Sequence, residues 1–166
     1  MSALHRAAAY GHASAVEKLI AAGASLPLKT SNEGFTAMHW ASEYGHVAIV
    51  RMLLRGGAAV ADVTFETAWT PLHRAALDGH VAVVRVLLEG GSPVAPRDKD
   101  GDTPLHDAAR NGHLPVVKAL VAAGSPVETP PTTLHPPPSP FTPHPSPLSS
   151  LLSPSHPLTL SPSHPL

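Results

Sequence analysis

The chain has no cysteine and few aromatic residues, and each shortage limits what it can be. Without cysteine, its 166 residues can form no disulfide framework, no thiolate metal site and no cysteine nucleophile. Hydrophobic residues reach 43% but aromatic ones only 4%, so a core is possible but must be aliphatic and rich in alanine. No run approaches the roughly eighteen apolar residues of a membrane-spanning helix, and the first residues, MSALHRAAAYGH, lack a signal-peptide pattern. We therefore expect a cytoplasmic or nuclear protein without membrane insertion.

Charge is nearly balanced overall and unevenly distributed along the chain. The formal net charge is -1, which provides no basic surface for nucleic acid. All charged side chains lie between Arg6 and Glu128, whereas residues 129–166 have none and hold most of the 20 prolines. Such a segment has too much proline and too little periodicity to pack. We predict a folded domain at 1–128 and a disordered, low-complexity tail at 129–166.

One pattern of eleven residues occurs four times in the folded part, as SALHRAAAYGH, TAMHWASEYGH, TPLHRAALDGH and TPLHDAARNGH. Its histidines are His5, His39, His73 and His106, separated by 34, 34 and 33 positions. A fixed period in this range is typical of stacked repeat architectures. The predicted repeats cover approximately residues 1–32, 33–66, 67–99 and 100–128.

Each repeat contains the signals of two short helices, most clearly in the third copy. Thr70 is placed to accept the free N–H groups of a helix start, and Pro71 suits the first helical position because its missing N–H costs nothing there. Gly79 then ends this helix. The following residues 81–89, VAVVRVLLE, place apolar side chains at helical spacing before Gly90. The unit is therefore predicted to be helix, turn, helix.

The Thr-Pro-Leu-His start, the Gly-His between helices and the Val-Val and Leu-Leu pairs of the second helix resemble the ankyrin repeat of about 33 residues. The resemblance covers residues 2–128. It implies an all-α ankyrin-repeat solenoid of stacked helix-turn-helix units with short β-hairpin fingers. In that family, the fingertips and first helices form a concave surface that binds other proteins.

Departures from the pattern carry expectations of their own. The chain starts at the first helix of repeat one, so Ser2 caps that helix and no hairpin precedes it. In the junction ADVTFETAW, Phe65 stands where the family usually has Asp and Ala68 where it has the turn glycine. That hairpin is expected to be irregular or loose. No polar capping repeat is predicted at either end.

Twelve histidines and one acidic cluster raise the question of metals. Eight of the histidines occupy framework positions, where the ankyrin family uses the ring to hydrogen-bond neighbouring loops and helix ends, so a structural role is predicted. Asp98, Asp100 and Asp102 are spaced as in a calcium loop, but Gly101 is misplaced and the terminal Glu is missing. Phosphate-binding glycine loops, nucleophile elbows and metalloprotease motifs do not occur. We expect no metal, no cofactor, no catalytic residue and no enzyme.

Positions that the ankyrin framework leaves variable supply the candidate partner-binding residues. These residues are Tyr10, Phe35, Trp40, Glu43, Tyr44, Trp69, Arg74, Asp78, Asp102, Asp107 and Arg110. Most of the chain's aromatic residues fall in this set, and interface hot spots favour Trp, Tyr and Arg. Two alternatives stay open: the tryptophans could serve local packing, and the aspartates could form a solvated face.

These patterns favour a monomeric, non-enzymatic protein-interaction module, an adaptor or scaffold. Its partner would offer apolar anchors to repeats one to three and a basic segment to repeats three and four. One alternative is a regulatory ankyrin fragment of a larger enzyme or channel. Another is a truncated product whose tail derives from non-coding sequence. A third is a proline-motif ligand at 136–147, PPPSPFTPHPSP, which has no flanking Lys or Arg to orient it.

Overall fold

The computed structural model describes residues 1–127, and its regular secondary structure is helical throughout that range. The predicted tail at 129–166, with its proposed proline motif, lies outside the described residues. Eight helices are formed within residues 1–127: α1 (Ala3–Ala9), α2 (Ala13–Ala21), α3 (Ala37–Glu43), α4 (Val47–Arg55), α5 (Pro71–Leu77), α6 (Val81–Glu89), α7 (Pro104–Arg110) and α8 (Leu114–Ala122).

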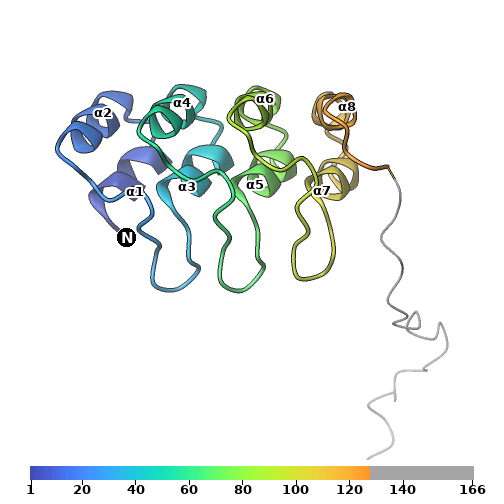
Figure 1. Cartoon of the computed structure of the whole chain (residues 1–166), viewed down its shortest axis with the longest axis horizontal. Helices are drawn as coiled ribbons and strands as arrows, with labels where there is room; N and C mark the ends of the chain where they lie inside the picture. Colours follow the sequence, from blue (N-terminus) through green and yellow to red (C-terminus); the bar gives the residue numbers. More distant parts are fainter. Residues whose placement is uncertain (128–166) are drawn as a thin grey trace, which may run out of the picture. The chain divides into compact units, whose positions relative to one another are not determined.

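The helices form two parallel rows (Figure 1). The first helix of each pair, α1, α3, α5 or α7, packs against its neighbours in one row, and the second helices α2, α4, α6 and α8 pack in the other. Each first helix also packs against the second helix of its own pair. Three long loops project from the first row as fingers (Figure 1). This arrangement confirms the all-α solenoid of stacked helix-turn-helix units.

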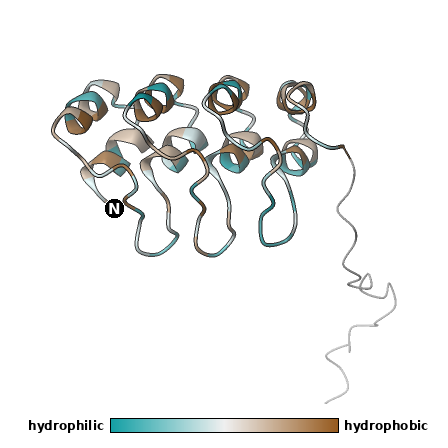
Figure 2. Ribbon diagram, in the orientation of Figure 1, coloured by the Kyte–Doolittle hydropathy of each residue, from teal (hydrophilic) through white to brown (hydrophobic). Residues whose placement is uncertain are grey.

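Alanines in the first row and larger aliphatic residues in the second build the core. Ala75, Ala76 and Leu72 of α5 have no exposed surface, and neither do Leu53 of α4 and Leu87 of α6. The small alanine side chains let neighbouring helices approach closely. Each fully buried leucine contributes roughly 1.5–3 kcal/mol. Figure 2 shows hydrophobic colouring concentrated on the helices, whereas the finger that precedes α7 is hydrophilic.

A threonine and a histidine cap each first helix of the second, third and fourth pairs. The backbone N–H of Thr70 donates to Nδ1 of His73 at 3.1 Å, and Thr70 Oγ1 accepts from the His73 backbone N–H. Since Nδ1 accepts, the ring proton sits on Nε2, which faces the Asp102 carbonyl at 3.4 Å. In the preceding repeat, His39 Nε2 bonds the Trp69 carbonyl at 3.0 Å in the same way. The predicted structural role of these histidines is confirmed.

The second histidine of a repeat joins it to the repeat before. Nε2 of His46, His80 and His113 lies 2.8–3.0 Å from the carbonyls of Ala9, Glu43 and Leu77, respectively. Each of these rings lies against a glycine of the preceding repeat. A Cβ on Gly45, whose φ is +73°, would sit 2.7 Å from the His80 ring. Glycine is required there both for the left-handed backbone and for the close approach of the ring.

The finger between α4 and α5 is held by hydrogen bonds, which corrects the expectation of a loose hairpin. No finger within residues 1–127 contains a β-strand, so the expected β-hairpins are turns without strands. The Thr64 N–H donates to the Trp69 carbonyl at 3.0 Å, and the Trp69 N–H donates to Thr64 Oγ1 at 2.9 Å. The finger before α3 makes the same two bonds between Thr30 and Phe35. Ala68 satisfies the turn by adopting φ 58°, the left-handed region usually left to glycine.

Neighbouring fingers are also bonded to one another. The Phe65 N–H donates to the Glu33 carbonyl at 3.0 Å, and the Lys99 N–H donates to the Thr67 carbonyl at 3.0 Å. The ring of Phe65 lies against Gly34, where a Cβ would come within 2.8 Å of it. Phe65 therefore ties two fingers together, which gives this departure from the family pattern a packing role.

Candidate functional site

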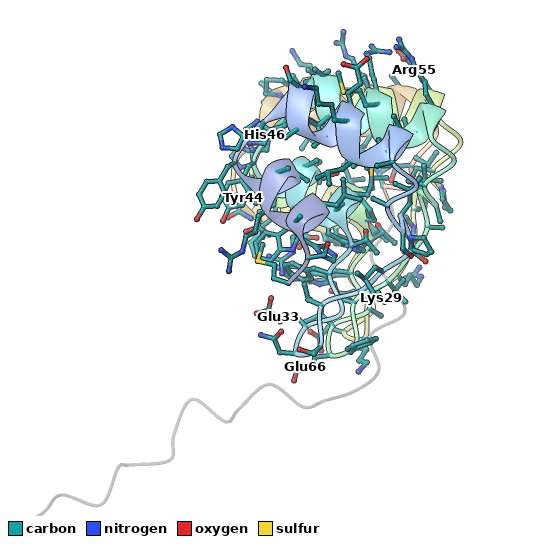
Figure 3. All side chains as sticks on the ribbon, turned by 90° about the vertical axis from the view of Figure 1, so that its left-hand side faces the viewer. Lys29, Glu33, Tyr44, His46, Arg55 and Glu66 are labelled. Atoms are coloured by element: carbon teal, nitrogen blue, oxygen red, sulfur yellow. The ribbon has the colours of Figure 1, made fainter. Side chains whose placement is uncertain are left out.

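The candidate residues lie on the first-helix row and on the fingers that extend from it. Trp40 and Glu43 belong to α3, and Tyr44 caps its C-terminal end. Figure 3 shows Tyr44 and His46 projecting from one side of the stack, with Glu33 and Glu66 at the fingertips. Helical spacing brings Trp40 and Tyr44 onto one face of α3, so both rings reach the same surface.

Three aromatic residues surround one pocket on this surface, which we call the aromatic pocket. Its volume is about 710 Å³, and it is lined by Met1, Arg6, Ala9, Tyr10, Trp40, Tyr44 and His46. Tyr10 is 73% exposed and Tyr44 51% exposed, whereas Trp40 is partly buried. The Trp40 and Tyr44 rings lie nearly parallel, with 6° between planes and 6.1 Å between centroids. The structure thus joins residues from repeats one and two around a single apolar hollow.

Phe35 does not take part in that exposed surface. Its side chain is 3% exposed and packs edge-on against Trp40, with 4.9 Å between ring centroids. The guanidinium of Arg74 covers its other side, 4.4 Å from the ring centroid. The prediction that Phe35 contacts a partner is therefore corrected: the ring supports Trp40 and Arg74 from beneath.

Arg74 is fixed between two aromatic rings rather than free in solution. Its guanidinium lies 4.5 Å from the Trp69 ring as well as 4.4 Å from Phe35. Trp69 is held in turn by its indole N–H, which donates to Asp98 Oδ2 at 2.9 Å. Cation–π contacts of this kind stabilise by about 0.5–1 kcal/mol each, and more when desolvated. These contacts give Trp69 a role in local packing, which was the alternative to partner binding.

A second hollow, which we call the acidic pocket, adjoins the first. Its volume is about 440 Å³, and it is lined by Glu43, Tyr44, Arg74, Leu77, Asp78 and His80. Glu43 Oε2 lies 3.7 Å from Arg74 Nη1, too far for a hydrogen bond, and it has no other bonding partner within the described residues. Burial raises the pKa of Glu43, Arg74 lowers it in part, and the neighbouring charges of Asp78 and Glu33 raise it further. Asp78 is exposed.

The structure repeats one unit, which consists of a helix pair, a threonine–histidine cap and a histidine that bonds the preceding repeat beside a glycine. This unit is typical of one known family. A family model described as ankyrin repeats (3 copies) matches residues 1–64 and 58–130. The chain belongs to the ankyrin repeat family. A search of curated proteins found no match. Ankyrin repeats are, in general, non-catalytic protein–protein interaction modules.

The acidic residues of the fourth ankyrin repeat are largely engaged within the stack. Asp102 forms an ion pair with Arg110, which also approaches Asp107 Oδ1 at 3.4 Å. The side chain of Asp107 is only 1% exposed, and its burial raises the pKa to about 6. Asp107 cannot present its carboxylate to a partner, which corrects its place among the candidate contacts. A basic segment of the partner cannot therefore bind this carboxylate.

Sequence reasoning missed part of the aromatic pocket. The sequence predicts only a framework role for His46 in the ankyrin unit, yet its ring both bonds the Ala9 carbonyl and lines the pocket. Arg6 and Ala9 line it as well, from positions of α1 equivalent to Trp40 and Glu43 of α3, where the repeat pattern predicts groove-facing residues.

The described part of the ankyrin stack provides no metal-binding geometry. Within residues 1–127, no group of three or more His, Asp or Glu side chains is arranged to hold a metal ion. The helices of this same range are all too short, or too polar, to cross a bilayer.

Proposed function

We propose that this ankyrin stack is a non-enzymatic adaptor or scaffold that binds a partner protein through the aromatic pocket and the neighbouring first-helix surface. The observation that supports this most directly is the exposure of Tyr10 and Tyr44 beside Trp40 in a pocket of about 710 Å³. The general role of ankyrin repeats agrees with it. The proposed setting is a monomer in the cytoplasm or nucleus.

The proposed binding is favourable because the tyrosine rings of the pocket expose apolar area to solvent. A tyrosine side chain buries about 150–250 Å² when fully covered, and apolar area contributes roughly 25 cal/mol per Å². Tyr10 and Tyr44 are both more than half exposed, so a partner has most of this area to cover. Tyrosine and tryptophan in such pockets are the residues whose truncation costs about 2 kcal/mol or more at interfaces. We expect these two tyrosines to dominate the affinity.

The double variant Tyr10→Ala/Tyr44→Ala tests the proposal. Proteins captured from a cell lysate by the immobilised wild-type chain should be identified by mass spectrometry and compared with those that the variant captures. The matched control is Leu114→Ala/Val121→Ala, because these α8 side chains are 58% and 43% exposed but do not line the pocket.

The expected result is a set of proteins retained by the wild type and the α8 control but lost from the tyrosine variant. Both variants should unfold in urea with midpoints close to that of the wild type, because exposed side chains contribute little to stability. Identical captured sets for all three chains would contradict the proposed surface.

A further inference from the structure

We propose that the partner presents a peptide segment in which a Lys or Arg side chain adjoins a large apolar one, with the cation in the acidic pocket and the apolar side chain in the aromatic pocket. This inference rests on the proposed function and adds the chemistry of the ligand. It assigns Glu43 and Asp78 to recognition of the cation, and Tyr10, Trp40 and Tyr44 to the apolar side chain.

The two pockets are adjacent because they share a wall. Tyr44 lines both the aromatic pocket and the acidic pocket. Tyr44 is 51% exposed, so a ligand in either pocket can contact it. A single peptide can therefore fill both pockets, with Tyr44 between its apolar and its basic side chains.

The acidic pocket carries negative charge that the protein does not neutralise. Two carboxylates, Glu43 and Asp78, line it against one cation, Arg74. Arg74 is held between the rings of Phe35 and Trp69, and its approach to Glu43 stops at 3.7 Å. The Glu43 oxygen that faces Arg74, Oε2, is buried without a hydrogen-bond partner, whereas Asp78 is exposed. A ligand ammonium or guanidinium would supply the charge that this arrangement lacks.

The surrounding charges also set where a cation can bind and in which direction a peptide lies. Arg6 lines the aromatic pocket but not the acidic pocket, so a cation is repelled from the first and attracted to the second. The exposed face of Tyr44 adds a cation–π contact. Farther along the stack, Asp102 is paired with Arg110 and Asp107 is buried. The binding site for the basic group therefore lies in repeats two and three.

A random 12-residue peptide library displayed on phage tests this chemistry directly, because the selection itself supplies the ligand. The full-length wild-type chain is the bait, and the bound sequences are counted after several rounds. We expect enrichment of Lys or Arg next to a leucine, isoleucine or aromatic residue. Asp78→Asn should lose the basic enrichment and keep the apolar one, whereas Tyr10→Ala should do the reverse.

The matched control is Glu17→Gln. Glu17 is exposed on α2, so this variant makes the same change of charge away from both pockets. It should select the same peptides as the wild type. If Glu17→Gln abolishes the basic enrichment as fully as Asp78→Asn does, net charge rather than the acidic pocket selects the peptides, and the inference fails.

The affinities of selected peptides then measure the contact between the basic residue and the acidic pocket. The most enriched peptide, carrying a fluorescent label, and a copy with its basic residue replaced by norleucine are titrated by fluorescence anisotropy. We expect the replacement to weaken binding to the wild type about tenfold, because part of the charge pair is desolvated. On a Glu43→Gln/Asp78→Asn variant the two peptides should bind equally, as a double-mutant cycle requires of interacting groups.

The outcomes separate this inference from the proposed function. Selected peptides that depend on Tyr10 and Tyr44 but carry no basic residue would overturn the inference and leave the function standing. Peptides enriched in Asp or Glu would do the same. If the wild-type chain enriches no sequence beyond the Tyr10→Ala/Tyr44→Ala variant, both proposals fail.

Discussion

Asp107 makes the stack less stable at neutral pH than a neutral side chain would. The carboxylate is buried in α7, and its Oδ2 has no hydrogen-bond partner within the described residues. Arg110 contributes only a 3.4 Å contact at Oδ1. Burial therefore raises the pKa to about 6 from the ordinary 3.8, although Arg110 lowers it in part. We predict that Asp107→Asn, a change of nearly equal size, increases the free energy of unfolding at pH 7.5.

The magnitude follows from the pKa shift. A shift of about two units corresponds to about 3 kcal/mol, which is the upper limit of the gain. Burying the new amide N–H₂ without a partner costs about 1 kcal/mol of this. The expected gain is therefore about 1–2 kcal/mol at pH 7.5.

The sign of the pH dependence is also fixed. Because the folded-state pKa of Asp107 lies above the unfolded one, its contribution is fully favourable below pH 3.8 and is lost as the pH rises through about 6. Urea unfolding followed by circular dichroism should show the advantage of Asp107→Asn growing between pH 4 and 6.5. The control Asp100→Asn changes an exposed fingertip residue and should leave stability within about 0.5 kcal/mol. A variant that is less stable at pH 7.5, or equally shifted at pH 4 and pH 7.5, would refute the reasoning.

Three further changes have expected outcomes in the same urea assay. Ala68→Gly should stabilise by about 0.5–1 kcal/mol, because the strain at φ 58° exceeds the added flexibility of the unfolded chain; a loss of stability would contradict this. Burial lowers the pKa of His39 to about 4, so the wild type should lose up to about 3 kcal/mol as the pH falls from 6.5 to 4. His39→Gln keeps a capping side chain that does not titrate and should flatten that loss, and an unchanged pH profile would count against it. Arg74→Lys should cost about 1 kcal/mol, because an ammonium cannot stack flat between Phe35 and Trp69; equal stability would show that the stacking is unimportant.

Local signals were sufficient to predict the helix pairs. Thr70 and Pro71 mark a helix start by properties that a single turn of backbone imposes, and α5 begins at Pro71 as expected. The period of 34 residues then makes stacking the way to bury the apolar faces, which is why the solenoid could be predicted. These features depend on neighbours in the chain or on the repeat itself.

Side-chain exposure within the candidate site could not be predicted in the same way. Phe35 is buried because Arg74, from the next repeat, covers it. Asp107 is buried by packing around α7, although its position in the ankyrin pattern faces the groove. At Ala68, the hydrogen bonds that join neighbouring fingers stabilise the turn despite the strain of a left-handed backbone. Each outcome is decided by side-chain contacts in the folded stack, which spacing alone does not specify.

The histidine links between repeats limit how such a chain can change in length. His80 bonds the Glu43 carbonyl one repeat back, and His113 bonds the Leu77 carbonyl in the same relation. Every link spans one repeat. The His113 link covers 36 positions and the other two cover 37, so a change of one residue in a finger leaves the contact intact. An inserted residue within a helix pair would instead shift a ring away from its carbonyl and its glycine. Removing or duplicating a whole repeat keeps all remaining links in register. Whole repeats and finger residues can therefore be gained or lost with less disruption than residues within a helix pair.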